Sequence, residues 1–182
     1  MTEEVEYHYE LKIAKDRIAV LIGKGGETKR RLEKLTGTKI DVSSQEGDVM
    51  LSGKDPIGLY SAKEIVTAIG RGFNPDVAKQ LVKQDYGFEI INLGELATTK
   101  DQLNRLRGRV IGEGGKGRKT IERLTDSNIA VYGKTIGIIG RVEMLPLARR
   151  AIESLLAGSK HATVYKWLEK RGKELKIRSY ER

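Results

Sequence analysis

Residues 21–42 read LIGKGGETKRRLEKLTGTKIDV, and residues 110–131 read VIGEGGKGRKTIERLTDSNIAV. The two stretches align over 22 positions without a gap, at an offset of 89 residues, and nine positions are identical. The similarity resumes at an offset of 87 residues, where Ile65 matches Ile152. Because a repeat of this length indicates a duplicated structural unit, we predict two similar domains within the 182 residues.

The first copy has the pattern of a small α+β unit. Polar and apolar side chains alternate over residues 7–13, as they do in a half-buried strand. An apolar helical segment over residues 15–22 is separated by the glycines at 23–26 from a second helix over residues 27–35. A last helix is expected to begin at the cap residue Asp55. The two strands of the intervening hairpin are predicted at residues 38–42 and 48–51.

The predicted helices also have an expected core face. The spacing of leucines places Leu32 and Leu35 toward the core from the second helix. On the last helix, the side chains expected in the core are those of Ile57, Tyr60, Ile65 and Ile69.

The second copy repeats this order, and both copies are therefore predicted as β-α-α-β-β-α units of the α+β class. It begins near residue 88, its glycines lie at 112–115, and its hairpin turns at 133–134. Its later elements are expected to be strands at 128–132 and 135–139 and a helix at 142–156. The predicted divisions are a first domain at 1–72, a connecting helix or linker at 73–84, a second domain at 85–158 and a basic C-terminal helical extension at 159–182.

Composition narrows the functional classes. Cysteine is absent and only two histidines occur, His8 and His161, so disulfides, metal sites and a histidine-based catalytic cluster are not expected. No stretch approaches the ~20 consecutive apolar residues of a membrane helix, and the N-terminus lacks the pattern of a signal peptide. We therefore expect a cytoplasmic protein without a membrane partner.

The net charge of +9 is carried by the second half of the chain. Residues 1–80 contain 13 Lys and Arg against 13 Asp and Glu, whereas residues 81–182 contain 21 against 12. A basic excess favours an anionic partner, although a solubilising surface would have the same composition.

The glycine loops have a specific physical use between two helices. Glycine has no Cβ, so a nucleic-acid backbone can approach closely, and glycine also tolerates positive φ. The helix that follows presents unpaired N–H groups and a positive dipole end toward phosphate oxygens. Apolar residues beside such a loop can form a narrow groove for unstacked bases, which is how single-stranded RNA is read.

These segments resemble the KH family of RNA-binding domains. The first copy matches the family pattern with Ile22-Gly23-Lys24-Gly25-Gly26 and the second with Ile111-Gly112-Glu113-Gly114-Gly115, and the resemblance covers about residues 6–70 and 85–157. It implies two tandem type I KH domains, each with a three-stranded antiparallel sheet packed on three helices, followed by a C-terminal helix. It also implies that each domain clamps about four nucleotides of a single strand, without cofactor, metal or catalytic residues.

The resemblance and the surrounding charges give a candidate RNA-binding set. The expected residues are Ile22, Gly23, Lys24, Gly25, Gly26, Lys29, Arg30, Arg31, Lys39 and Ile40 in the first domain, and Arg109, Ile111, Gly112, Glu113, Gly114, Gly115, Lys116, Arg118, Lys119 and Ile129 in the second. Glu113 departs from the pattern, because KH loops often carry Lys or Arg at this position. The neighbouring basic residues are expected to keep the local field positive, so that the second domain still binds RNA.

Other interpretations of the same residues remain open. Residues 112–120 superficially resemble a P-loop of a nucleotide hydrolase, but Arg118 stands between Gly117 and Lys119, where that motif needs Gly-Lys-Ser/Thr. One KH copy could instead bind protein, because charge alone does not identify the ligand. The tail is expected to be a helix packed on the second domain, with Trp167 in the core, and the alternative is an added RNA arm or a partner-docking helix.

The two-domain layout with a basic extension resembles the archaeal relatives of the Krr-type and partner-of-Nob ribosome-assembly factors. This resemblance implies a non-enzymatic protein that binds the 3′ end of small-subunit rRNA and works with a processing endonuclease or another ribosome-assembly protein. The alternative within RNA binding is a general mRNA or exosome-associated adaptor.

Overall fold

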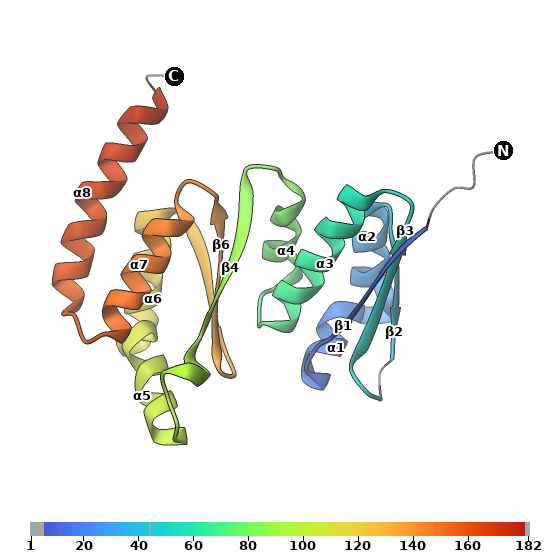
Figure 1. The fold of residues 1–182 in the computed structure, drawn as a ribbon, viewed down its shortest axis with the longest axis horizontal. Coiled ribbons are helices and arrows are strands. Elements are labelled where there is room, and N and C mark those ends of the chain that lie inside the picture. The colour runs from blue at the N-terminus through green and yellow to red at the C-terminus, as the bar shows by residue number, and fades with distance from the viewer. Residues whose placement is uncertain (1–5, 44, 181–182) are drawn as a thin grey trace. The chain divides into compact units, whose positions relative to one another are not determined.

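In the computed structural model, which describes residues 6–43 and 45–180, each copy of the repeat folds as a separate unit (Figure 1). The first unit extends to Tyr86 and the second begins at Gly87. Both contain a three-stranded antiparallel sheet, so the predicted α+β class with two KH-type units is confirmed. Within the described residues, no helix is long and apolar enough to cross a membrane.

The first unit has the sheet order β1-β3-β2, with the hairpin strand β3 in the centre. Its elements are β1 (Tyr7–Lys12), α1 (Lys15–Ile22), the 3-10 turn η1 (Lys24–Gly26), α2 (Glu27–Thr36), β2 (Lys39–Val42), β3 (Asp48–Gly53), α3 (Pro56–Gly70), α4 (Pro75–Ala78) and η2 (Lys79–Val82). Leu51 of β3 pairs with Tyr9 on one side and Ile40 on the other, and the side chains of Leu51 and Ile40 are fully buried. One face of the sheet therefore contributes the core under the helices.

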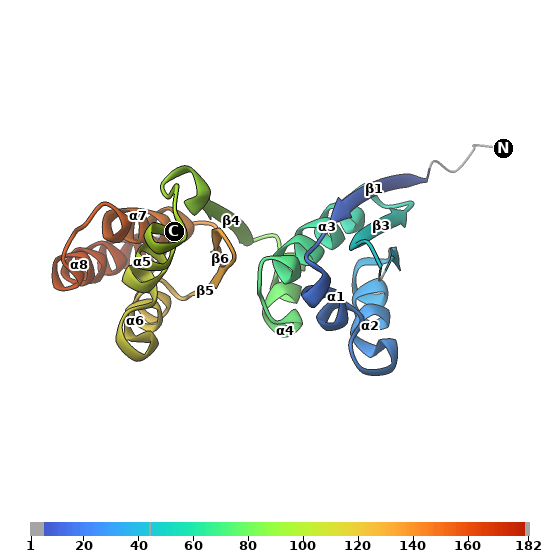
Figure 2. The ribbon, with the colours of Figure 1, turned by 90° about the horizontal axis from the view of Figure 1, so that it is seen from below.

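The second unit has the equivalent sheet order β4-β6-β5. Its elements are β4 (Tyr86–Asn92), η3 (Leu93–Glu95), α5 (Lys100–Ile111), η4 (Glu113–Gly115), α6 (Lys116–Thr125), β5 (Ser127–Tyr132), β6 (Thr135–Arg141), α7 (Leu145–Leu156) and α8 (His161–Tyr180). Figure 2 shows α5, α6, α7 and α8 on one side of this sheet. A capping box of Thr99 and Gln102 fixes the start of α5, which is four residues longer than α1.

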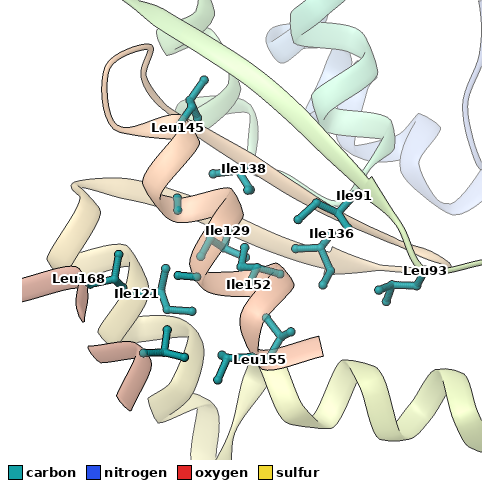
Figure 3. Close-up of a cluster of buried hydrophobic side chains, with 14 residues drawn as sticks. Ile91, Leu93, Ile121, Ile129, Ile136, Ile138, Leu145, Ile152, Leu155 and Leu168 are labelled. Carbon is teal, nitrogen blue, oxygen red and sulfur yellow. The ribbon is translucent and has the colours of Figure 1, made fainter. Parts of the chain in front are cut away.

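The C-terminal helix α8 is part of the second unit. It packs on α6 and α7, and it contributes Val164 and Leu168 to a cluster that also holds Ile121 and Ile152 (Figure 3). Trp167 is only partly buried against this cluster, and the guanidinium of Arg150 lies 5.1 Å from the centre of its ring. Val164 and Leu168 of the basic tail therefore lie in the core, whereas Lys166, Glu169, Lys170, Arg171 and Lys173 are exposed.

Each unit contains an arginine that binds backbone carbonyl groups at the C-terminal end of its third long helix, α3 or α7. In the first unit, Arg17 donates from Nε to the carbonyl oxygen of Ile69 (2.8 Å) and from Nη2 to that of Phe73 (2.7 Å). In the second, Arg109 donates to the carbonyl oxygens of Leu155 (2.7 Å) and Ser159 (2.8 Å). We call this pair of bonds the arginine clamp. The carbonyl oxygens of Ile69 and Leu155 also accept the backbone N–H of Gly72 and Gly158 (3.1 Å each), so the clamp adds a side-chain donor to each helix end and ties it to the residue that follows.

The segment after the first clamp packs on the first unit. Phe73, Ala78 and Leu81 are buried, and α4 and η2 lie against α3. We predicted residues 73–84 as a connection between domains. The apolar side chains of this segment instead make it part of the first unit, which extends to Tyr86.

The helix phase differs from the prediction at three positions. Leu35 is 44% exposed, Ile57 is 72% exposed and Tyr60 is 55% exposed, so none of them is a core residue. The carboxylate of Asp55 accepts hydrogen bonds from the N–H groups of Ile57 and Gly58, which fixes where α3 begins. That start turns a different stripe of α3 toward the sheet, formed by Leu59, Ala62, Ile65, Val66 and Ile69.

We predict that Leu168→Ala lowers the free energy of unfolding of the second unit by about 2–5 kcal/mol, because the loss of a fully buried leucine leaves a cavity. The chain has a single tryptophan, Trp167 in α8, so urea unfolding followed by its fluorescence reports on this unit. Ile177→Ala, on an exposed side chain of the same helix, is the matched control and should change the value by less than about 0.5 kcal/mol. An unchanged midpoint for Leu168→Ala would show that α8 does not stabilise the unit.

Candidate nucleic-acid interface

The two glycine loops have the same backbone conformation. Gly23 and Gly112 have φ of 73° and 71°, with ψ of 176° in both. Gly25 and Gly114 have φ of 59° and 58°, and the residue before each following helix is again a left-handed glycine. The repeated sequence therefore encodes one loop geometry twice.

The glycines serve two different purposes. A Cβ on Gly23 would lie 2.2 Å from Oγ1 of Thr28, and one on Gly112 would lie 2.6 Å from the backbone nitrogen of Gly117. Close contact between loop and helix therefore requires glycine at the first position. A Cβ on Gly25 would meet nothing within 4 Å, and the same holds for the three other inner glycines, Gly26, Gly114 and Gly115. Those four positions leave the backbone open to a close-approaching ligand.

Each loop ends at a helix start that has no side-chain cap. The residues before α2 and α6 are the glycines Gly26 and Gly115, which have no side chain to cap the helix. The first N–H groups of an α-helix have no intrahelical acceptor. The N–H of the first residue of each helix is already donated within the turn, from Glu27 to the carbonyl of Lys24 and from Lys116 to that of Glu113. An anion at this end would therefore be held by the N–H groups that follow in the first turn and by the helix dipole.

The basic residues predicted around the first loop differ in their availability. Lys24 is exposed at the loop. Arg30 donates from Nη2 to the carbonyl oxygen of Gly25 (2.9 Å), and Lys29 donates to Glu33 (2.9 Å). Lys39 forms an exposed ion pair with Asp41 (3.1 Å) on the neighbouring edge strand. Lys24 is thus the cation best placed for a ligand, whereas Arg30 and Lys29 also hold the loop and helix in shape.

Arg31 lies on a different side of α2. It forms an ion pair with Asp76 (3.1 Å), which also binds Lys79 (3.0 Å). The hydrogen bond and charge of Lys79, together with the charge of Arg31, hold the pKa of the Asp76 carboxyl below its ordinary value. Arg31 therefore points toward the α4 segment and away from the glycine loop.

Around the second loop, Lys116 and Lys119 are exposed in the first turns of α6, and Glu113 is exposed at the loop itself. Arg118 donates from Nη1 to the carbonyl oxygen of Ile129 (3.2 Å), which ties α6 to the edge strand β5. The loop thus carries a carboxylate, and the first two turns of the following helix carry two exposed lysine side chains.

Three residues predicted to contact RNA make contacts within the protein instead. Arg109 forms the arginine clamp on α7, so its guanidinium is committed to the protein rather than to a ligand. Ile40 and Ile129 are 0% and 2% exposed, which leaves no side-chain surface for a base. Ile22 and Ile111, directly before the loops, are half-buried and keep some apolar surface.

The sequence did not single out the role of one repeated residue. Glu33 accepts a hydrogen bond from the N–H of Ile40 (2.9 Å), and Glu122 accepts the same bond from Ile129 (2.8 Å). Both glutamates are identical positions of the repeat. They join the helix after the loop, α2 or α6, to the edge strand, β2 or β5, of the same unit.

The geometry does not support the P-loop interpretation. A P-loop follows a strand, whereas the glycines of the second unit follow helix α5. Among residues 6–43 and 45–180, no group of three His, Cys, Asp or Glu side chains is placed to hold a metal ion.

Comparisons with known proteins agree with this geometry. A family model described as "KH domain" matches residues 8–68, and one described as "Eukaryotic type KH-domain (KH-domain type I)" matches residues 87–173. The chain is 44% identical over 175 residues to a KH domain-containing protein of Methanocaldococcus jannaschii, a match that covers 94% of this chain and 77% of that protein. It is 34% identical over 114 residues to the RNA-binding protein PNO1 of Oryzias latipes, covering 62% of this chain and about half (47%) of that relative.

A solved structure is also similar over nearly the whole chain. It is a chain of the crystal structure of an a/eIF2alpha–aDim2p–rRNA complex from Pyrococcus horikoshii. The TM-score is 0.88 at 44% identity, and the match covers 94% of this chain and 97% of that one. The similarity thus extends over both units.

We predict that Gly112→Ala costs at least about 2 kcal/mol of unfolding free energy, because its Cβ would force the loop away from Gly117. Gly114→Ala should cost only about 1 kcal/mol of unfolding free energy, which is the strain of an alanine in the left-handed conformation. Trp167 fluorescence during urea unfolding compares the two variants. Equal losses would mean that the first glycine has no packing role beyond its φ.

Proposed function

The chain belongs to the KH-domain family, together with archaeal Dim2p and eukaryotic PNO1, and from this premise we propose that it binds single-stranded RNA during assembly of the small ribosomal subunit. The observation that carries the proposal is the pair of matching glycine loops. In each, the open inner glycines lie directly before an uncapped helix start. This arrangement suits a phosphate backbone and offers no residues for chemistry, so we infer a binding role rather than an enzymatic one.

The proposed contacts follow from exposure. Phosphate oxygens would approach Gly25 and Gly26 or Gly114 and Gly115 and receive hydrogen bonds from the N–H groups of α2 or α6. Bases would turn toward the half-buried surface beside the loop, at Ile22 in the first unit. The buried strand residues act only as support for that surface.

The two units would contribute differently. The whole basic excess of the chain lies in residues 81–182, and Lys116 and Lys119 are exposed beside the second loop. Neutralisation of phosphates by lysine releases counterions from the RNA, which supplies affinity that depends on salt. We infer that the second unit supplies most of the electrostatic attraction, and that Glu113 excludes phosphate from its own position and sets where the backbone passes.

The similar solved structure supports ribosomal RNA as the target. That complex contains Dim2p, rRNA and a/eIF2alpha. We propose the 3′ end of small-subunit rRNA as the ligand and a ribosome-assembly protein or processing endonuclease as the partner, with the chain presenting or shielding the single strand. The alternative of a general mRNA or exosome-associated adaptor predicts no preference for this strand.

We predict that Gly25→Asp and Gly114→Asp each lower affinity for single-stranded RNA by roughly tenfold or more, because a carboxylate would meet the phosphate backbone. The double variant should bind at the background level. A Cβ at either position would meet nothing within 4 Å, and Asp tolerates left-handed φ, so the fold should persist. Fluorescence anisotropy with a labelled strand measures the affinity, and circular dichroism checks the fold.

Gly37→Asp is the matched control for the first loop. Gly37 is also a left-handed glycine in open space, but it lies at the other end of α2, and the second unit has Asp126 at the equivalent position. It should change RNA affinity by less than about twofold, as surface changes away from a site usually do. If both loop variants fold and retain wild-type affinity, the loops are not the RNA site.

We predict tighter binding to a short strand that copies the 3′ end of small-subunit rRNA than to a scrambled strand or a duplex. Duplex RNA should bind poorly, because its narrow major groove excludes side chains and its bases are not splayed. The three ligands are compared by anisotropy at two salt concentrations. Equal and strongly salt-dependent affinities would indicate a basic surface without sequence readout, which would contradict the proposed target.

A further inference from the structure

The first unit contains a shortened version of helix α8. The α4–η2 segment begins at Pro75, five residues after α3 ends, and α8 begins at His161, five residues after α7 ends. An arginine clamp precedes each segment, and each segment packs on the second and third long helices of its own unit, α2 and α3 or α6 and α7. The α4–η2 segment ends at Val82, whereas α8 continues to Tyr180. The first unit therefore has no counterpart to the second half of α8.

In the second unit, that half of α8 covers the end of α6. Gly172 is buried, and a Cβ on it would lie 3.5 Å from the carbonyl oxygen of Leu124. Leu124 is partly buried against the core. Glu169 and Arg123 line the same shallow groove between the two helices. A helix with a small residue against the leucine and an acidic residue beside the arginine thus closes this surface.

The equivalent surface of the first unit is open. Leu35, which corresponds to Leu124 in the repeat, is 44% exposed. It lies in a groove of about 550 Å³ whose lining residues are Arg31, Leu32, Lys34, Leu35 and Lys79. The two leucines form the apolar part of this groove, and the arginine and the two lysines form its basic part. Asp76 partly balances Arg31 and Lys79, and Lys34 is exposed. We call this surface the α2 groove.

We propose that the α2 groove binds an amphipathic helix of a partner protein, with small and apolar residues on Leu35 and Asp or Glu toward Lys34, Arg31 and Lys79. The second unit shows that a helix fits this face of the fold, and the basic rim selects an acidic one. An apolar floor favours protein over RNA as the occupant.

The α2 groove is separate from the proposed RNA site. Lys34 and Leu35 lie in the last turn of α2, whereas the glycine loop precedes its first turn. At 1.5 Å per residue these ends are on the order of 12 Å apart, so both surfaces can be occupied together. The inference goes beyond RNA binding and does not depend on it.

The probe is a synthetic, fluorescein-labelled helical peptide. Its Val, Leu and Gly stand at positions i, i+4 and i+8, as Val164, Leu168 and Gly172 do in α8, and Glu occupies the flanking positions. Anisotropy with the full chain should show binding to this peptide and none to a scrambled peptide of the same composition. Leu35→Asp should weaken binding at least about tenfold, as expected for a central apolar contact.

Leu96→Asp is the matched control, because Leu96 is also an exposed leucine, on the second unit; it should leave the affinity within about twofold, as remote surface changes do. Lys34→Glu should weaken the Glu-flanked peptide and strengthen a Lys-flanked version of it. Circular dichroism confirms that each variant folds. Binding that does not exceed the scrambled peptide, or that Leu35→Asp leaves unchanged, overturns the proposal. Displacement of the peptide by a short single-stranded RNA would assign the groove to RNA and overturn it equally.

Discussion

The close contact between each glycine loop and the helix behind it is the constraint on which the rest of the structure depends. A Cβ on Gly23 would lie only 2.2 Å from the nearest atom of α2, and a Cβ on Gly112 would lie only 2.6 Å from the nearest atom of α6. The loop keeps its glycines in left-handed conformations, and the next helix then begins at a glycine, without a side-chain cap. Glu33 and Glu122 carry the same geometry to the edge strand, because each accepts the N–H of the isoleucine opposite. The conformation of the loop and its connection to the edge strand thus recur together in both units.

Two units with the same loop differ in their surroundings. The first carries Lys24 at its loop and has no net charge over residues 1–80, whereas the second carries Glu113 but holds the basic excess. The first leaves the end of its second helix open, and the second closes the same place with α8. Duplication therefore gave one fold two surfaces, one suited to attract a polyanion and one with room for a protein partner.

The repeat made most of the fold predictable from the sequence. Two aligned copies reveal element order, loop positions and the α+β class, because turn chemistry and hydrophobic period recur together. Helix phase was less accessible. Leu35 is apolar but exposed because its covering helix is missing, and Ile57 and Tyr60 depend on where Asp55 caps α3. The structural roles of Arg109, Ile40 and Ile129 were also not evident from the sequence. A charged or apolar residue near a loop can face either solvent or the protein interior, and its type does not show which.

The arginine clamp has a consequence for exchanging the two modules. Arg17 lies five residues before Ile22, whereas Arg109 lies only two before Ile111, although these isoleucines are equivalent in the repeat. The two copies thus reach carbonyl groups at the same distance from the end of α3 or α7, but from different turns of the first helix. A chimera that grafted α1 onto the second unit would carry its guanidinium on the wrong turn and remove the side-chain donor from the carbonyl groups of Leu155 and Ser159. The first and last helices of each copy are a matched pair, and recombination between the copies has to transfer them together.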